Sequence, residues 1–439
     1  AGDTLTLKQV LGQVLSAHPL ARQAALVPEL AKTDLRLARG AFDPKIHARL
    51  DEKNFNNKQY FRHLDAEIKV PTRAGFDIKA GYENNTGAFI DADEKMPEGG
   101  LYYLGVSVPV LRNLVFDERR AELQEAKVFL QMSLAEQRKM LNKLFFEVNK
   151  SYWYWWASYE KLQINTKGLA VAQDRFTYVK GAHELGKYAA IDTTEAEMEL
   201  QRRQVELSYA LMEYNQAKLE LSKHIWDENG QPLMLTDSLL PSATGTELQL
   251  ISLEPLMDFA LSEHPELQKA NLKQNALKIN QKLYRWSLLP QLDVEFKPLL
   301  AGSVNNAMLT ENYKWGFTFT APIFMRKERA KLAANQIKIT QQNVEVELLT
   351  RHIQLILRQA YTALQQYEAI LIAQQINTNN ALQLRDAEQM RFELGSSNVF
   401  FINYRDRYYL DNLLKLADLK AKYAISKAEV YWASGQTAP

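Results

Sequence analysis

The sequence predicts a mainly α-helical chain with strands that belong to a transmembrane β-barrel. Three observations predict this fold class. The chain repeats itself, it contains helical stretches too long for a compact domain, and it contains short segments in which apolar and polar residues alternate. Together they indicate a duplicated unit of helix, strands, long helix and helix.

The first observation is the internal repeat. The segment Ser-Ala-His-Pro at 16–19 returns as Ser-Glu-His-Pro at 262–265. Further along, a second constant shift takes Arg120 to Arg329 and holds for about a hundred residues without a gap. One shift that serves so many pairs indicates two copies of one unit. The first copy carries about 37 more residues, which lie between Pro44 and Arg120.

Both copies show the same order of elements, ending in a Gly-marked turn and a helix about half as long as the helix before it. This order assigns 1–226 to the first repeat, 227–250 to a linker rich in Gly and Pro, and 251–439 to the second repeat. We expect the elements at 5–41, 45–110, 116–183 and 190–226 in the first repeat, and at 252–288, 291–321, 325–392 and 398–433 in the second.

The second observation is helix length. About 68 helical residues span on the order of 100 Å, far more than the helices of ordinary globular domains. Apolar residues recur along them at helical spacing, as at Leu123, Ala126, Leu130 and Leu134. A single helix cannot bury such a stripe alone, so we expect lateral packing, with each long helix paired to two shorter helices stacked end to end.

The third observation is strict alternation in 64–70, 76–83, 103–108, 292–297 and 315–320. A soluble sheet with one wet face gives the same pattern. These strands adjoin helices of this length and carry charges on one face throughout. Both features favour a wall with one face toward lipid and the other toward a water-filled lumen. So few strands cannot close a barrel, for which about eight is the minimum, and several chains must therefore share one.

The composition excludes several other classes of protein. The 53 basic and 52 acidic residues nearly cancel, so no basic face for nucleic acid is indicated. The chain has no Cys, which fits a periplasmic or surface location. No signal peptide is present; a mature chain after signal removal, which we expect here, would begin this way, and so would a cytosolic chain. No apolar run of about 18 residues is present, so any membrane crossing must use strands.

No residue pattern points to catalysis, a metal or a cofactor. The acidic run at 91–94 lacks the rest of an EF-hand loop, which predicts a solvated surface loop. His18 and His264 are repeat partners beside Pro, which predicts a structural role for both. Nucleophile-elbow, P-loop and dinucleotide fingerprints are missing from the sequence.

The duplicated order of elements resembles the TolC-like family of outer-membrane efflux and secretion channels. Three patterns carry the resemblance, and each occurs twice. They are the His-Pro motif at 16–19 and 262–265, the strand ending in Pro before a long helix at 106–111 and 319–324, and the aromatic-x-x-Gly turn at 176–186 and 391–395. The match covers essentially the whole chain, with His where the family often has Asn.

The resemblance implies a homotrimeric tunnel, with four strands from each chain in a twelve-stranded barrel and with helices that cross the periplasm. It implies a passive conduit that opens when a periplasmic adaptor protein and an inner-membrane transporter dock at its periplasmic end. We therefore expect the exit channel of a tripartite efflux pump or type I secretion system in the outer membrane of a Gram-negative cell. The alternative is a coiled-coil structural or surface protein with a soluble sheet.

The first copy offers more strand-like sequence than two strands need. Either a hairpin such as 64–83 is an addition, or the strand count departs from that of the family. We favour an addition.

The turns near Gly186 and Gly395 should form the closing end. The residues expected at this periplasmic tip are Leu185, Gly186, Asp192, Glu195, Leu394, Gly395, Phe400, Phe401 and Tyr404. Asp192 can serve as an acidic constriction or as a helix cap. Phe401 stands at the matching position of the second copy, so the run Val399-Phe400-Phe401 predicts either an apolar gate that excludes water or contacts between helices.

Aromatic residues fall into two groups. The run of five at 152–156 lies roughly 48 Å along the helix from Arg120, too far away for a membrane belt. We expect it to pack between helices or against the linker. The expected membrane girdle consists of Tyr102, Tyr103, Trp315 and Phe317.

Overall fold

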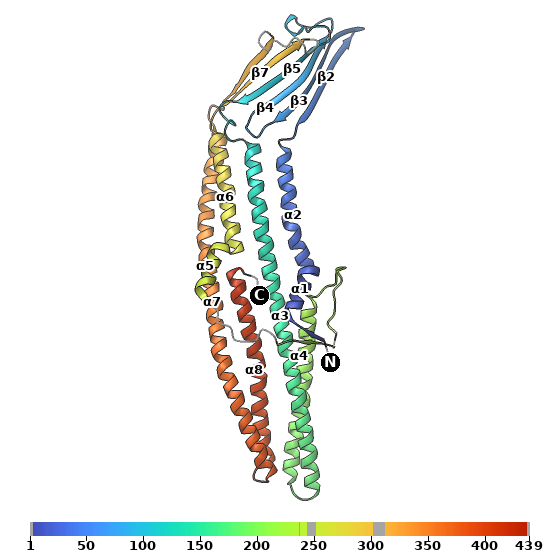
Figure 1. Cartoon of the computed structure of the whole chain (residues 1–439), viewed down its shortest axis with the longest axis vertical. Helices are drawn as coiled ribbons and strands as arrows, with labels where there is room; N and C mark the ends of the chain where they lie inside the picture. Colours follow the sequence, from blue (N-terminus) through green and yellow to red (C-terminus); the bar gives the residue numbers. More distant parts are fainter. Residues whose placement is uncertain (1–2, 237, 244–251, 302–311, 437–439) are drawn as a thin grey trace. The chain divides into compact units, whose positions relative to one another are not determined.

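The computed structural model describes residues 3–236, 238–243, 252–301 and 312–436. These residues are mainly helical, with one large antiparallel sheet (Figure 1). The chain divides into two compact units, and each takes segments from both halves of the sequence. The first unit consists of Ala1–Leu26, Ala135–Gln268 and Leu348–Pro439, and the second of Val27–Leu134 and Lys269–Glu347.

The helices follow the predicted order. They are α1 (Leu7–Ala17), α2 (Pro19–Gly40), α3 (Glu118–Glu184), α4 (Ala190–Ser222), α5 (Leu253–Glu263), α6 (Pro265–Trp286), α7 (Arg326–Glu393) and α8 (Val399–Ser434). The two long helices have 67 and 68 residues, so their predicted length is confirmed. No helix in the described ranges combines the length and the apolar character that a membrane crossing needs.

The stretches 5–41 and 252–288 were each expected to hold one helix, and this expectation is wrong. Each holds two helices, because a Pro follows a His at the break. The imidazole Nδ1 of His18 accepts a hydrogen bond from the Leu20 N–H at 3.1 Å, and that of His264 accepts one from the Glu266 N–H at 3.3 Å. Both rings therefore cap a new helix, which confirms their predicted structural role. Burial lowers the pKa of both imidazoles.

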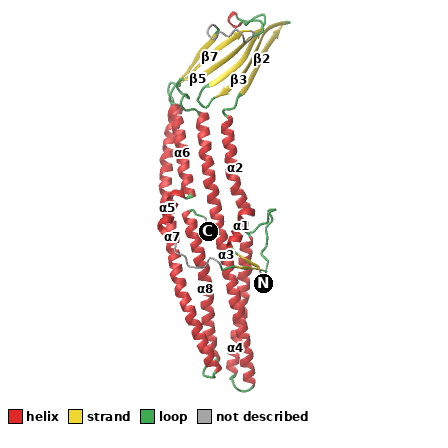
Figure 2. Ribbon diagram, viewed as in Figure 1, coloured by secondary structure: helices red, strands yellow, loops and turns green. Residues whose placement is uncertain are grey.

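The sheet has the strand order β2-β3-β4-β5-β7-β8, and every neighbouring pair is antiparallel. Its strands are β2 (Lys45–Phe55), β3 (Lys58–Pro71), β4 (Asp77–Thr86), β5 (Leu101–Pro109), β7 (Gln291–Ala301) and β8 (Tyr313–Thr320). Figure 2 shows these strands side by side. The expected hairpin at 64–83 consists of the second half of β3 and most of β4. Both strands lie inside one six-stranded sheet, so the strand count of this chain departs from the four that the resemblance implies, and the favoured interpretation of a separate added hairpin is corrected.

The register keeps apolar residues on one face across the sheet. Val70 pairs with Ile78, Ile78 with Val106, Val106 with Phe296, and Phe296 with Trp315. Because successive side chains of a strand point to opposite faces, the residues between these lie on the other face. We call the two sides the apolar sheet face and the polar sheet face.

The aromatic run at 152–156 lies in the core of the first unit. Trp153, Trp155 and Trp156 are buried beside Val10 and Val14 of α1 and Leu235 of the linker. The Tyr152 hydroxyl lies 2.9 Å from the carbonyl oxygens of Leu5 and Ser242. The prediction that this run packs against helices and linker is confirmed, although Tyr154 is exposed.

Two further segments complete the description. A short parallel pair, β1 (Asp3–Leu5) with β6 (Leu239–Pro241), joins the start of the chain to the linker and was not predicted. The acidic run at 91–94 includes a single 3₁₀ turn, Ala92–Glu94, with exposed residues, which confirms the predicted surface loop.

Candidate functional site

The apolar sheet face in the second unit is the larger candidate surface. Aromatic side chains of this face are exposed in the single chain, where Trp315 is 62% and Phe317 is 65% exposed. The exposed apolar residues of this face are Ile46, Leu50, Ile68, Ile78, Tyr102, Leu104, Val106, Phe296, Tyr313, Trp315, Phe317 and Phe319. Such a contiguous apolar surface marks a site of interaction with another protein or with a membrane.

Three of the four expected girdle residues lie on this face, and the fourth is corrected by the structure. Tyr103 is only 3% exposed and points to the polar sheet face, because its strand neighbour Tyr102 occupies the apolar one. Its hydroxyl donates a hydrogen bond to Glu67 Oε2 at 2.9 Å, and its ring packs over Gly81, where a Cβ would clash. Sequence reasoning also missed Phe296, Tyr313 and Phe319, which the same alternation could have revealed.

The polar sheet face carries charged side chains that pair across strands. Lys79 Nζ lies 2.6 Å from Glu295 Oε1, although β5 runs between their strands. Lys69 Nζ lies 2.9 Å from Asp77 Oδ2. A sheet with this face against water and the other against an apolar medium satisfies both sets of side chains.

The second candidate surface lies in the first unit, at the two tight turns. Gly186 has φ +74° and Gly395 has φ +73°, a left-handed conformation that favours Gly at the end of a helix. The neighbouring Leu185 and Leu394 are strongly exposed. We call the turn from α3 to α4 the first tip and the turn from α7 to α8 the second tip.

The start of each returning helix is capped by a side chain. Asp192 Oδ2 accepts a hydrogen bond from the Ala189 N–H at 3.1 Å. This contact is that of a helix cap, one of the two roles that the sequence offered for Asp192. At the second tip, Asn398 Oδ1 accepts one from the Phe401 N–H at 3.1 Å. Glu195 lies one turn beyond Asp192 and is half-buried.

The aromatic residues of the second tip separate into buried and exposed members. Val399 is buried with Val179 of α3, Ala196 of α4 and Phe392 of α7, so it packs between helices. Phe400 and Phe401 are exposed, with ring centres 5.7 Å apart, and Tyr404 is exposed one turn later. Contacts between helices of this chain therefore account for Val399 and leave both Phe rings free.

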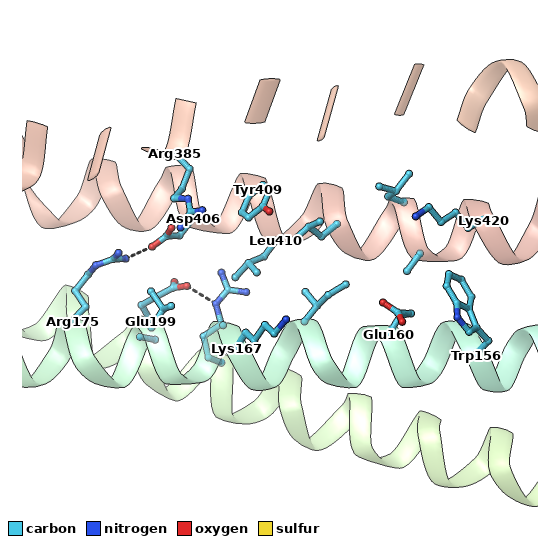
Figure 3. A pocket seen from close by; sticks show the side chains of 18 residues that line it. Trp156, Glu160, Lys167, Arg175, Glu199, Arg385, Asp406, Tyr409, Leu410 and Lys420 are labelled. Atoms are coloured by element: carbon cyan, nitrogen blue, oxygen red, sulfur yellow. Dashed lines mark hydrogen bonds and ion pairs between the residues drawn. The ribbon is translucent and has the colours of Figure 1, made fainter. Parts of the chain in front are cut away.

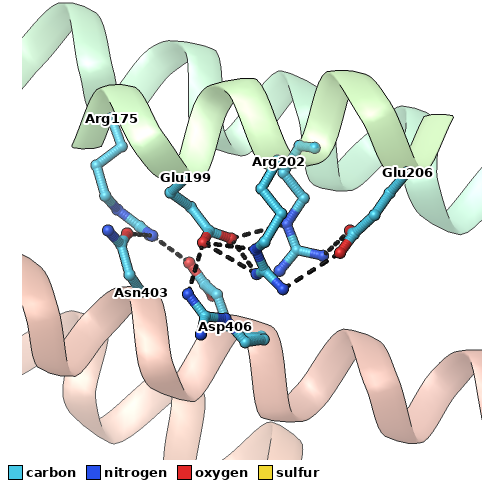
Figure 4. Close-up of polar contacts among 8 residues, drawn as sticks. Arg175, Glu199, Arg202, Glu206, Asn403 and Asp406 are labelled. Carbon is cyan, nitrogen blue, oxygen red and sulfur yellow. Dashed lines mark hydrogen bonds and ion pairs between the residues drawn. The ribbon is translucent and has the colours of Figure 1, made fainter. Parts of the chain in front are cut away.

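A charged network joins α3, α4 and α8 (Figure 4). Its members are Arg175 of α3, Glu199, Arg202, Arg203 and Glu206 of α4, and Asn403, Asp406 and Arg407 of α8. Burial alone would raise the pKa of Glu199, but the guanidinium groups of Arg202, Arg203 and Arg407 lower it below its usual value. Sequence reasoning missed this network, although the i, i+3, i+4, i+7 spacing of its α4 members places them on one helix face.

A cavity of about 470 Å³ adjoins the network (Figure 3). Leu410 and other apolar residues line its wall, and Lys167 and Lys420 bring charge to it. Trp156 Nε1 and Arg203 Nη2 are buried at this cavity without a hydrogen-bond partner in the described part of the chain. Among the described residues, no cluster of three or more His, Asp or Glu could hold a metal ion.

Comparison with models of protein families and with curated proteins finds no match. Solved structures do match over nearly the whole chain. The open-state MtrE outer-membrane channel of Neisseria gonorrhoeae has a TM-score of 0.68 at 15% identity, with 98% of this chain and 89% of that chain covered. The CmeC outer-membrane channel of Campylobacter jejuni gives 0.66 at 14% identity, with 98% and 85% covered. The outer-membrane protein VceC of Vibrio cholerae gives 0.66 at 12% identity, with 98% and 96% covered. The chain therefore has the fold of outer-membrane channels, as its resemblance to the TolC-like family predicted.

Proposed function

We propose that the chain is one subunit of a homotrimeric exit channel in the outer membrane of a Gram-negative cell. The channel is a passive conduit that performs no chemical reaction and holds no cofactor. The single observation that carries the proposal is the division of the sheet into an exposed apolar face and a charged face. The shared fold with outer-membrane channels supports the same function.

The alternative, a structural protein with a soluble sheet, is disfavoured by the same surface. A soluble sheet buries its apolar face against helices or a second sheet. Here Trp315, Phe317 and Phe319 are all more than half exposed in the chain. Lipid on the apolar sheet face and water on the polar sheet face would satisfy both sides. Tyr102, Trp315 and Phe317 then serve as girdle residues at the membrane surface.

The helices are proposed to continue the conduit into the periplasm. Paired helix lengths support a duplicated unit, since α1 and α5 have 11 residues each and α2 and α6 have 22 each. We keep the repeats at 1–226 and 251–439 and the linker at 227–250 as part of this proposal.

The two tips are proposed as the gated periplasmic end, where a periplasmic adaptor protein and an inner-membrane transporter dock. Leu185, Gly186, Asp192, Glu195, Leu394 and Gly395 would form the contact surface. The exposed rings of Phe400 and Phe401, with Tyr404, would narrow the opening and exclude water when closed. The pump or secretion partner would set the cargo, because a wide lumen discriminates little.

The gate is tested with Phe401→Ala in planar bilayers. Loss of the exposed ring should raise the leak of ions through the closed channel several-fold. Leu211→Ala removes a similarly exposed apolar side chain from α4, away from the tips, and serves as the control. A leak equal to that of the unaltered channel would end the assignment of Phe401 to the gate.

The proposed function itself is tested by extraction and conductance. The protein should require detergent for extraction, have the mass of a trimer in detergent, and conduct ions in planar bilayers. A protein that remains monomeric in buffer without detergent contradicts the channel. A detergent-free trimer that does not conduct favours the structural alternative.

A further inference from the structure

We propose that three copies of this chain close one barrel of eighteen strands, in which β8 of each copy pairs with β2 of the next. This inference rests on the proposed homotrimeric channel and specifies its wall. The resemblance implies only four strands from each chain, whereas the sheet of this chain has six. The interaction surface is therefore the two open sheet edges, and the partner is a second copy of the chain.

The first argument is that the inserted strands β3 and β4 are integral to the sheet. β3 pairs with β2 from Lys58 to Lys69, and β4 pairs with β5 from Asp77 to Glu83. Both are central strands, so moving them out of the wall would leave two ladders of backbone groups unpaired. Water is absent from the membrane core, so unpaired backbone groups there have no hydrogen-bond partner and such a displacement is strongly unfavourable.

The second argument is that side-chain contacts on the polar sheet face cross the inserted strands. The Tyr103 hydroxyl reaches Glu67 Oε2 at 2.9 Å, which joins β5 to β3 across β4. Lys79 Nζ reaches Glu295 Oε1 at 2.6 Å, which joins β4 to β7 across β5. Because the inserted strands share one polar face with β5 and β7, they belong to the same wall.

The third argument is that the apolar sheet face runs through the inserted strands without a break. Ile68 of β3 and Ile78 of β4 are exposed on it, between Ile46 of β2 and Val106 of β5. A hairpin that stood in water outside the barrel would have no need of this exposed apolar side. Lipid contact along all six strands accounts for it.

The fourth argument concerns the two edges. All eight residues of β8 are exposed, and an exposed aromatic edge strand invites pairing with another chain. With six antiparallel strands, β2 and β8 run in opposite directions. Rotation about a barrel axis keeps strand direction, so β8 of one copy meets β2 of the next as an antiparallel pair. Both edges also present apolar residues to the apolar sheet face and polar residues, such as Arg49 and Thr318, to the other.

The consequence is a wider barrel. Strands spaced about 4.8 Å apart and tilted by about 40° give a backbone diameter of about 36 Å for eighteen strands, against about 24 Å for twelve. The insertion adds strands and no α-helix, so the extra width belongs to the strand region. The lumen there would take cargo considerably broader than a single helix, whose diameter is about 10–12 Å.

The edge pairing is tested by cross-linking, for which the absence of native Cys gives a clean background. Arg49→Cys on β2 is combined in turn with Lys314→Cys, Thr318→Cys or Thr320→Cys on β8, so that several registers are sampled. A short bis-maleimide is applied to the detergent-solubilised protein. At least one pair should yield covalent trimers on a denaturing gel. The matched variant Lys79→Cys with Thr318→Cys should yield at least tenfold less covalent trimer. Two strands separate β4 from β8, namely β5 and β7 within one copy and β2 and β3 across the proposed junction.

The outcomes separate the two proposals. Covalent trimers through Lys79 and Thr318 would place β4 next to β8 of the next copy, which leaves β2 and β3 outside a twelve-stranded wall and overturns the inference. Conducting trimers in which no β2–β8 pair cross-links overturn it as well, while leaving the channel intact. Covalent dimers without covalent trimers also overturn the inference. Protein that is monomeric and does not conduct contradicts the proposed channel itself.

A second measurement requires no variant. Electron cryo-microscopy of the unaltered protein in lipid nanodiscs should show eighteen strands around the lumen. A count of twelve in a trimer overturns the inference even if the cysteine variants fail to fold. It would also identify a wall that excludes β3 and β4, in which β2 still meets β8 of the next copy and cross-links to it.

Discussion

Replacing Glu199 by Gln should loosen the pairing of α4 with α8 more than any other single change in the charged network. The Glu199 carboxylate is 5% exposed and accepts hydrogen bonds from Arg202 at 2.6 Å, Arg203 at 2.9 Å and Arg407 at 3.1 Å. Arg407 belongs to α8, so this carboxylate links the two helices. The lowered pKa of Glu199 means that it is ionised at neutral pH.

The magnitude follows from the burial of its partners. Glu199→Gln keeps the shape of the side chain but removes the charge that faces Arg203, which is 2% exposed and still pairs with Glu206 at 2.7 Å. Removal of one partner from a buried ion pair costs about 3–5 kcal/mol. Arg202 and Arg407 reach solvent and can rehydrate, so we expect the lower value, about 3 kcal/mol. This corresponds to an opening equilibrium about a hundredfold more favourable.

The assay is hydrogen exchange of the detergent-solubilised protein, followed by mass spectrometry. Backbone amides of α8 near Asp406 should exchange about a hundredfold faster in Glu199→Gln, while amides of the sheet should not change. Glu220→Gln is the matched control on the same helix. Its carboxylate pairs with Lys223 at 2.6 Å, but both side chains are at least 60% exposed, so the loss should be below about 1 kcal/mol.

The pH dependence supplies a second check with a definite sign. A carboxyl group whose pKa is lowered by folding stabilises the fold above its unfolded pKa and loses this contribution as pH falls through the lowered value. Acidification below about pH 4 should therefore loosen α8 in the unaltered protein and much less in Glu199→Gln. Exchange rates of α8 that agree within threefold between the variant and the unaltered protein would refute the reasoning.

Three further predictions concern the core, the helix breaks and the turns. Trp155→Ala removes a fully buried side chain and should destabilise the fold by about 3–5 kcal/mol, whereas Tyr154→Ala, at an exposed site, should change the melting temperature little. Burial lowers the pKa of His264. The contribution of the neutral imidazole to the free energy of unfolding is therefore present above about pH 6.5 and is lost as pH falls through the lowered value. His264→Asn should therefore flatten the fall of the melting temperature between about pH 7 and about pH 5, and an unchanged slope contradicts this. Gly395→Ala should cost about 1–2 kcal/mol, because φ is +73° and a Cβ there meets open space. Gly435→Ala should cost more, because its Cβ would lie 2.8 Å from Pro265 Cδ, and equal melting temperatures for the two variants would contradict this.

The helices and strands were predictable because their signals are local. The 3.6-residue periodicity along α3 and the two-residue alternation along β7 each depend only on neighbours in the sequence. The left-handed turns at Gly186 and Gly395 were likewise visible, since a left-handed residue after a helix is most often Gly. The alternation in 315–320 also placed Trp315 and Phe317 on the exposed apolar face.

The break at Pro19 was missed because a Pro is tolerated in the first turn of a helix, so its presence alone does not mark an interruption. Tyr103 was assigned to the girdle by residue type, although the alternation itself places it opposite Tyr102. The charged network escaped notice because Asn403, Asp406 and Arg407 come from α8, about 200 positions away in the sequence from Glu199.

The sequence by itself determined the order of the main elements, the lengths of the two long helices and the two-faced character of the strands, because each is set by residues a few positions apart. The tertiary structure alone decided that β3 and β4 lie inside one six-stranded sheet, since strand order depends on backbone pairing between distant segments. It also decided that Glu199 is shared by three Arg side chains and that Phe400 and Phe401 stay exposed beside a buried Val399. Burial and charge pairing arise only when helices from both halves of the chain pack together, and no local pattern contains that information.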